Sequence, residues 1–251
     1  MTSSAAGHEA AAVKVAAVST KHPRLRVALV GADGAGKSTI SQMLERAALP
    51  LPVKRIYMGV NLDASSLMLP TTRLLLAAKR ARGGRPDLVA TRLASRTDDP
   101  SESRKRRRSV KDGARLMVWM LEEWLRQLLA TGYSSRGYIV VFDRHFFADY
   151  YHSDIAAGPA GRDAFSRLHG WMLQHAYPKP DLVVCLDAPA EVLFARKPEA
   201  SRDWLEQRRQ QYLGLAGVVP AFAVVDADRP LDIVLSDVVE TIRTHWKAPS
   251  T

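Results

Sequence analysis

The sequence predicts an α/β fold in which one five-stranded parallel sheet lies between two layers of helices. Five short, nearly continuous apolar runs alternate along the chain with stretches whose apolar residues recur at helical spacing. Such runs are typical of parallel strands that are buried on both faces. The first run leads directly into the glycine-rich stretch GADGAGKST, and ligands of such sheets bind beyond the carboxyl ends of the strands. These observations predict both the fold and the place of its site.

The first half of the chain predicts three strands and two helices. The first strand covers about 25–30, and the helix that opens near Gly36 continues until Pro50 and Pro52 stop it. The second strand is VKRIYM, and the third is GYIVVFD, which ends at Asp143. Between them, residues 110–130 carry an apolar stripe at helical spacing, which predicts a long helix packed in the core. The stripe consists of Leu116, Met117, Met120, Leu121, Trp124, Leu125, Leu128 and Leu129.

The second half predicts two strands and three or more helical segments. A mixed helical stretch reaches about Tyr177, and DLVVCLD then predicts the fourth strand, with Cys185 filling core space. A helix begins near Pro189, where proline suits a first turn, and a helical segment rich in Arg and Gln follows it. The last strand is AFAVVDA. One face of the last helix carries Leu231, Val234, Leu235, Val238, Val239 and Ile242.

Length and composition predict a single globular unit over residues 24–251. The chain has 251 residues, of which 47% are hydrophobic, enough for one large α/β domain. Residues 1–23 are rich in Ala, Ser and Thr and predict a disordered tail. One cysteine cannot form a disulfide within the chain, which fits a reducing compartment. No apolar run approaches the roughly 18 residues that span a bilayer, so a cytoplasmic protein is expected.

The positive charge belongs to one segment. The formal net charge is +10, and residues 73–115 contain 14 Lys and Arg against 5 Asp and Glu. This segment lies within an expected basic insertion at about 61–115, between the second strand and the long helix. The run SRKRRRS has no interleaved aromatic residues for stacking on bases. A solvated charged loop is therefore favoured over a nucleic-acid or anionic-membrane site, although both remain open at this point.

The strongest chemical signal is the spacing Gly31-x4-Gly36-Lys37-Ser38 between a strand and a helix. This is the full pattern of a P-loop, whose backbone N–H groups cradle phosphates at a helix N-terminus. The lysine reaches the β- and γ-phosphates, and the Ser38 hydroxyl is the expected Mg²⁺ ligand. The predicted phosphate-contacting residues are Gly31, Ala32, Asp33, Gly34, Ala35, Gly36, Lys37, Ser38 and Thr39.

Two acidic positions and an arginine predict the rest of the site. Asp33 inside the loop either stabilises the turn or faces an acceptor hydroxyl or a Mg²⁺-bound water. Asp143 and Arg144 follow the third strand, where a carboxylate can hold Mg²⁺ and an arginine can clamp a phosphate. If the acceptor is a hydroxyl, then Asp143, Asp33 or Asp63 is available as a base. The histidines show no metal-ligand spacing and are expected to be packing or surface residues.

The stretches GADGAGKST, VVFDRH, PDLVVCLDAPAEVLFARK and VVDADRPLDIVLSDVVETI together resemble the thymidylate kinase family of P-loop nucleoside-monophosphate kinases. The resemblance covers about residues 25–60 and 137–245. It implies a P-loop NTPase fold, ATP and Mg²⁺ as cofactors, and a lid at about 196–209 that closes over the phosphates. The lid arginines available to neutralise the transferred group are Arg196, Arg202, Arg208 and Arg209. By the same resemblance, the adenine lies near Ala227, Asp228 and Arg229.

The acceptor side departs from this family. After the second strand the family usually has a Phe-Pro-x-Arg-like motif, whereas this chain reads IYMGVNLDASSLMLPTTR. The expected activity is therefore phosphoryl transfer from ATP to a small-molecule acceptor, either dTMP or another nucleoside monophosphate, or a nucleoside, sugar or other metabolite. The alternative is a nucleotide-controlled binding protein or NTPase that uses the basic segment. A homodimer is compatible with either reading.

Overall fold

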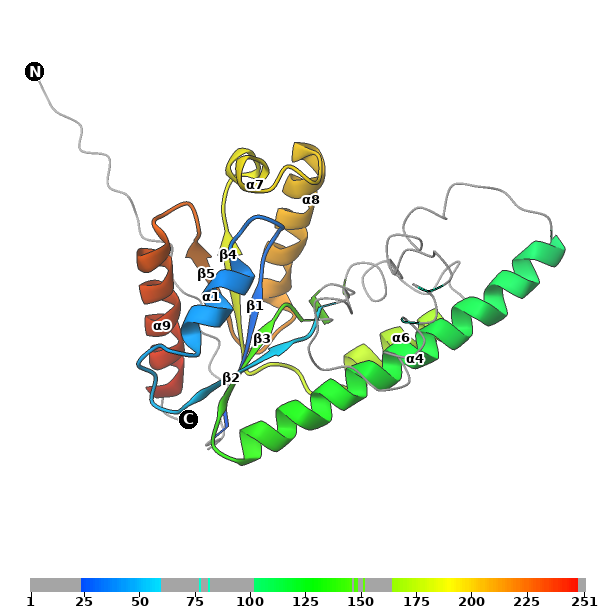
Figure 1. Cartoon of the computed structure of the whole chain (residues 1–251), viewed down its shortest axis with the longest axis horizontal. Helices are drawn as coiled ribbons and strands as arrows, with labels where there is room; N and C mark the ends of the chain where they lie inside the picture. The colour runs from blue at the N-terminus through cyan, green and yellow to red at the C-terminus, as the bar shows by residue number, and fades with distance from the viewer. Residues whose placement is uncertain are drawn as a thin grey trace, which may run out of the picture.

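The computed structural model describes residues 24–59, 77, 81, 102–145, 147, 148, 151 and 164–247. Within them the elements follow the predicted order (Figure 1). The predicted tail at 1–23 and residues 60–101, apart from 77 and 81, lie outside the described residues. The elements are β1 (Arg26–Val30), α1 (Lys37–Leu44), β2 (Val53–Tyr57), α4 (Glu102–Ser135), β3 (Ile139–Asp143), α6 (Ala164–His175), β4 (Leu182–Asp187), α7 (Ala190–Arg196), α8 (Arg202–Leu213), the 3₁₀ helix η3 (Gly214–Gly217), β5 (Phe222–Asp226) and α9 (Leu231–Lys247).

The described strands form one five-stranded sheet in the order β2-β3-β1-β4-β5, and every neighbouring pair is parallel. The predicted α/β class and the five-stranded parallel sheet are confirmed. Because β1 is central, its carboxyl end meets those of β3 and β4: Leu29 pairs with Asp143, and Val30 with Cys185. The loop that follows β1 therefore opens beside the end of β3.

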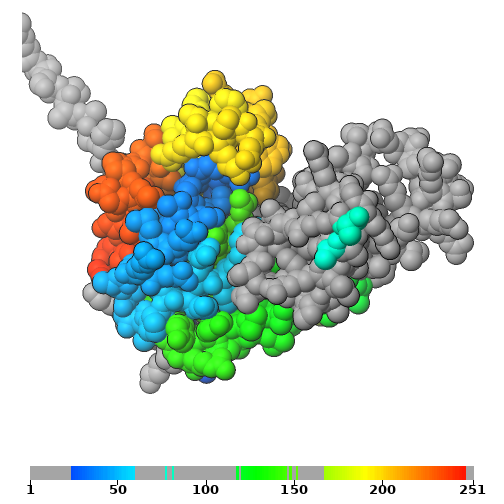
Figure 2. All heavy atoms as spheres, in the orientation of Figure 1, coloured from blue at the N-terminus to red at the C-terminus, as the bar shows by residue number. Residues whose placement is uncertain are grey.

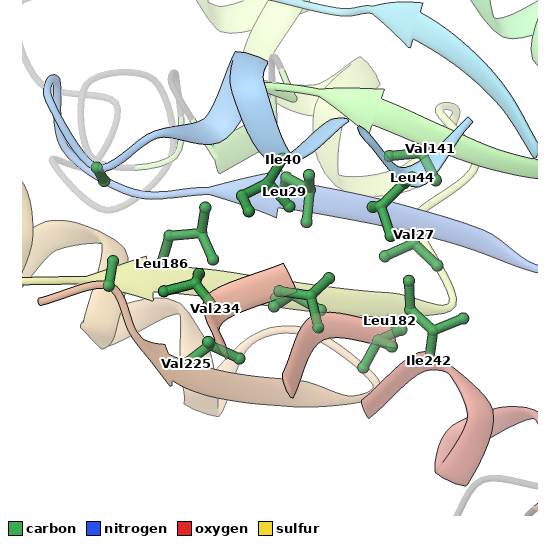
Figure 3. Close-up of a cluster of buried hydrophobic side chains, with 14 of the residues drawn as sticks. Val27, Leu29, Ile40, Leu44, Val141, Leu182, Leu186, Val225, Val234 and Ile242 are labelled. Atoms are coloured by element: carbon green, nitrogen blue, oxygen red, sulfur yellow. The ribbon is translucent and has the colours of Figure 1, made fainter. Parts of the chain in front are cut away.

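Alternation along the strands builds a core on each face of the sheet. Val27 and Leu29 of β1 point to one face, while Ala28 and Val30 point to the other, as successive strand residues must. Figure 3 shows the first cluster, in which α1 and α9 cover β1, β3, β4 and β5. Its labelled side chains are Val27, Leu29, Ile40, Leu44, Val141, Leu182, Leu186, Val225, Val234 and Ile242.

The second cluster lies on the opposite face, where α4, α6 and η3 contribute Ala130, Leu173 and Leu215. Cys185 belongs to this cluster and is 1% exposed. Burial raises the pKa of its thiol to about 12, with a smaller contribution from the nearby Asp187 carboxylate. The thiol therefore stays protonated at neutral pH and fills core space, as predicted. None of the helices in the described ranges combines the length and the hydrophobicity of a transmembrane span.

The predicted burial of the α4 stripe is wrong at three positions. Met117, Leu121 and Leu128 are 44%, 56% and 65% exposed. The buried face instead follows Met120, Glu123, Gln127, Ala130 and Ser134, which also recur at helical spacing. Two of the polar residues on this face have partners in other elements: Tyr177 donates to Glu123 over 3.0 Å, and Gln127 donates to the Pro178 carbonyl over 3.3 Å. The spacing of hydrophobic residues therefore predicted that this segment is a helix, but it did not predict which face of the helix is buried.

Two helix boundaries also differ from the predicted ones. α1 ends at Leu44 rather than near Pro50, since the next N–H groups turn back onto Gln42 and Met43 carbonyls in a tighter turn. α4 begins at Glu102 rather than near residue 110, so the run SRKRRRS forms its first turns. Residues 102–115, expected as the end of the basic insertion, are continuous with the long helix that Figure 1 shows extending beyond the sheet.

Replacing Leu29 by alanine is expected to lower the free energy of unfolding by about 2–5 kcal/mol, because the side chain is fully buried between α1 and the sheet. Leu121→Ala is the matched control on the exposed side of α4, and a change within about 0.5 kcal/mol is expected there. Urea unfolding followed by circular dichroism measures both. An equal loss in the two variants would mean that α4 packs in solution through its exposed leucines.

Candidate functional site

The loop between β1 and α1 packs against two other elements at the carboxyl edge of the sheet. Gly34 has φ +90°, and a Cβ there would lie 2.6 Å from the Leu193 carbonyl oxygen of α7. A Cβ on Gly31 would lie 2.3 Å from the Leu186 carbonyl oxygen of β4. Both positions therefore require glycine. In Figure 2 the yellow residues of α7 and α8 adjoin the blue residues of this loop and α1.

Lys37 is held inside this loop. The side chain is 5% exposed, and its ammonium group donates to the carbonyls of Gly31 over 2.7 Å and Ala32 over 2.6 Å. The N-cap residue of α1 is Gly36, which has φ 84°. Because glycine has no side chain, no side chain caps the N-terminus of this helix. The positive end of the helix dipole and a lysine therefore converge on the same loop, an arrangement suited to an anion.

Ser38 connects the loop to the end of β3, 105 positions later in the chain. Its hydroxyl donates to Oδ1 of Asp143 over 3.2 Å. A hydroxyl has one hydrogen and two lone pairs, so donation to Asp143 leaves the lone pairs of Oγ for a cation. Thr39, predicted beside it, is exposed on the first turn of α1.

Asp33 and Arg144 form an ion pair at the same edge of the sheet. Arg144 Nη2 lies 2.8 Å from Asp33 Oδ1, and both side chains are about a quarter to a third exposed. Burial alone raises the pKa of Asp33, but the positive charges of Arg144 and Lys37 outweigh it and hold the pKa below its ordinary value. The sequence left Asp33 either as a turn-stabilising residue or as a contact to an acceptor hydroxyl or a Mg²⁺-bound water, and the structure pairs it with Arg144.

Arg144 lies in the turn that directly follows β3, and the backbone conformation of this turn sets the direction of its side chain. This residue has φ 67°, which non-glycine residues seldom adopt. The next residue, His145, is 2% exposed, and its Nδ1 accepts the N–H of Phe147 over 3.2 Å. Burial, with a smaller effect of Arg26, lowers the pKa of His145 to about 3, so the ring is neutral at physiological pH. The expectation that His145 is a packing residue is confirmed.

The arginines of the expected lid have partners in α7, α8 and at the ends of β4 and β5. Arg209 makes two hydrogen bonds to Asp187 at the end of β4, of 2.7 and 2.8 Å. Arg208 donates to Gln211 and to the Tyr212 hydroxyl. Arg202 stacks over Phe194 at 5.1 Å. The segment 196–209 thus consists of the last residue of α7, a short turn and most of α8.

The region expected to lie near an adenine follows β5. Arg196 Nη1 donates to the Ala227 carbonyl over 2.8 Å, and its Nη2 lies 3.9 Å from Asp228. Arg229 pairs with Asp226 at 3.6 Å and with Asp237 of α9. These contacts connect the end of α7 to the end of β5, so the predicted residues Arg196 and Asp228 lie together. They are about 40–46% exposed and accessible to a ligand.

The described residues contain no group of three or more His, Cys, Asp or Glu side chains that could hold a metal ion. Mg²⁺ in phosphoryl-transfer sites takes one or two protein oxygens, with water and substrate phosphates supplying the others. Ser38 Oγ and the Asp143 carboxylate are such oxygens, 3.2 Å apart. This pair therefore fits Mg²⁺ bound together with a nucleotide better than Mg²⁺ bound by the protein alone.

Sequence reasoning missed two sets of polar contacts. Arg55 of β2 lies 3.4 Å from Asp143 Oδ2. It was missed because a single basic residue inside a strand belongs to no recognisable motif. Glu123 of α4 accepts from Tyr177 over 3.0 Å and lies 3.1 Å from His169, which is fully buried. The available sign of the second set was an acidic residue, Glu123, in a helix whose buried face was predicted from its leucines alone. Asp63, the third candidate base, lies outside the described residues.

No model of a known protein family matches the sequence, and a search of curated proteins finds no match. The interpretation of the site therefore depends on its own residues: the glycine-rich loop, the Ser38–Asp143 hydrogen bond and the Asp33–Arg144 ion pair.

Proposed function

We propose that this protein is a P-loop phosphotransferase, similar to thymidylate kinases, that transfers a phosphoryl group from ATP with Mg²⁺ to a small acceptor. The observation that carries the proposal is the hydrogen bond from Ser38 to Asp143. It brings the serine of the Gly-Lys-Ser sequence to the carboxylate at the end of the neighbouring strand. A solitary glycine-rich turn has no need of that carboxylate, whereas a nucleotide site requires both groups.

The donor half of the site consists of the loop, Lys37, Ser38 and Asp143. The Lys37 ammonium already lies on the loop carbonyls of Gly31 and Ala32, so a bound nucleotide would exchange these contacts for phosphate oxygens. Ser38 and Asp143 would hold Mg²⁺, which neutralises charge on the transferred group. Positioning and charge neutralisation supply most of the catalysis in this chemistry, because it needs little covalent help from the protein.

The acceptor half contains Asp33 and Arg144. A carboxylate with a lowered pKa is a weak base but a good hydrogen-bond acceptor. A phosphate acceptor needs no base, because it is already anionic, whereas a hydroxyl acceptor does. Asp33 is thus suited to accept a hydrogen bond from the acceptor rather than to take its proton, and the acceptor we propose first is a nucleoside monophosphate, such as dTMP, ahead of a nucleoside, a sugar or another neutral metabolite. Arg144 would then contact the acceptor phosphate or the transferred group.

The test is to incubate the full chain with ATP, Mg²⁺ and separate panels of nucleoside monophosphates, nucleosides and sugars while measuring ADP release. The expected result is release that depends on one class of acceptor, with the monophosphates first. ADP release that ignores every acceptor and is unchanged in Lys37→Ala would reject the proposal. Release with hydroxyl acceptors alone would retain the kinase but reject the argument from Asp33.

A further inference from the structure

Arg55 has no part in the sequence pattern of the proposed site, yet it contacts the carboxylate at its centre. It lies in β2, an edge strand of the sheet, and pairs in register with Val141 of β3. Its Nη1 is 3.4 Å from Oδ2 of Asp143. The Asp143 side chain is 2% exposed and that of Arg55 is 31% exposed. The arginine therefore places a positive charge from the protein surface beside a buried carboxylate.

The two oxygens of Asp143 are divided between two partners. Oδ1 accepts from the Ser38 hydroxyl over 3.2 Å, and Oδ2 accepts from Arg55 over 3.4 Å. Because each contact is made to a different oxygen, the two together restrict the rotation of the carboxyl group as well as its position. A buried carboxylate is costly without such compensation. Arg55 thus both orients Asp143 and compensates its charge when no cation is bound.

Arg55 also contacts Glu45. Its Nε lies 3.9 Å from Oε2 of Glu45, and its backbone N–H donates to Oε1 of Glu45 over 3.4 Å. Glu45 directly follows α1, the helix whose first turn carries Lys37 and Ser38. The arginine therefore joins the far end of that helix to the end of β3. Glu45 is more exposed than Asp143, so the contact to Asp143 is the stronger of the two.

We propose that Arg55 is a positioning residue for the metal site: it holds Oδ2 of Asp143 so that Oδ1 faces Ser38, and it opposes metal binding by its charge. This inference rests on the proposed function. A cation beside a carboxylate weakens the attraction of that carboxylate for a second cation. Without Arg55, the metal would become the compensating charge for Asp143. Metal binding should therefore become tighter, while turnover falls because the carboxylate is less well oriented.

Arg55→Gln removes the charge and leaves a neutral hydrogen-bond donor on a shorter side chain. Thermal unfolding of the full chain is measured with ADP and EDTA, and again with ADP and a series of Mg²⁺ concentrations, at pH 8. The metal-dependent rise in Tm gives the apparent Kd for Mg²⁺. We expect Arg55→Gln to unfold at a lower temperature without metal and to bind Mg²⁺ at least about 5-fold more tightly, the effect of one unit charge on a nearby divalent ion even at the dielectric constant of water.

Arg26→Gln is the matched control. Arg26 also lies in a strand, with its Nε 3.4 Å from Asp181 and a similar exposure, but at the amino end of β1. This variant should lower the metal-free Tm and leave the Kd for Mg²⁺ unchanged. Arg55→Lys, which keeps the charge, should restore the wild-type Kd.

The outcomes separate this inference from the proposed function. If Arg55→Gln leaves the Kd for Mg²⁺ unchanged while the wild type shows a clear metal-dependent rise in Tm, the inference is wrong and the proposed function stands. The same holds if Arg55→Lys binds Mg²⁺ like Arg55→Gln. If the wild-type protein shows no rise in Tm with ADP and Mg²⁺, the proposed function fails, and the inference fails with it.

Discussion

Lys37→Ala is expected to lower acceptor-dependent ADP release by about 100-fold or more, the usual scale for removing one preorganised charge donor from a reacting phosphate. The lysine is buried in the loop and held by the Gly31 and Ala32 carbonyls. Its ammonium group is therefore already positioned in the loop before a nucleotide binds. Initial rates at saturating ATP and acceptor measure the change in kcat.

Lys54→Ala is the control for this variant. Lys54 lies in β2, and its ammonium is 5.2 Å from the centre of the Tyr133 ring, so it also loses a defined contact. Its ADP release should stay near that of the wild type. A similar fall in both variants would show that general damage to the sheet, rather than phosphate binding, accounts for the loss.

Arg144→Ala should reduce kcat by about 100-fold and should also change how stability depends on pH. The arginine contributes to the lowered pKa of Asp33, against the effect of burial. A carboxyl with a lowered pKa in the folded state stabilises the fold above its unfolded pKa, and this contribution is lost as the pH falls through the folded pKa. Removing Arg144 moves the pKa of Asp33 upward, so the stabilisation is smaller and is lost at a higher pH.

The deficit in stability of Arg144→Ala relative to the wild type should therefore be largest near neutral pH. It should shrink as the pH falls through the region around and below 3.8, the ordinary pKa of this carboxyl. Urea unfolding between pH 3 and 7 measures it. Arg106→Ala, in the basic start of α4, should show normal turnover and no such pH dependence. Comparable losses of turnover in the two variants would assign the basic run a direct part in catalysis.

The sequence predicted the sheet well because its signal is local. Each strand is a short apolar run, and the alternation of Val27 to Val30 between two cores follows from strand geometry. The buried side of α4 was not predictable in the same way. Glu123 is buried there because Tyr177 donates to it from beyond α6, and no pattern within the helix reports a partner 54 positions away.

The site was predictable where residue types and spacing define the chemistry. The loop glycines, Lys37 and Ser38 belong to a continuous pattern, and Asp143 lies beside them because parallel strands end at one edge. Arg55 was missed because its role comes from strand pairing rather than from sequence neighbours. The sequence offered Arg209 as a lid residue, and its pairing with Asp187, 22 positions earlier, is a further contact that no local pattern reports.

The central position of β1 also has a consequence for the synthesis of the chain. β1 is made first among the strands, yet it lies between β3 and β4, which are made much later. Arg26, at its start, bonds to Asp181, 155 positions onward. At about 5–20 residues per second, a ribosome needs roughly 8–30 s to cover that distance. Until β3 has been made, this buried strand has neither neighbour, and until β4 has been made it has only one, so α1 or a chaperone must cover it meanwhile.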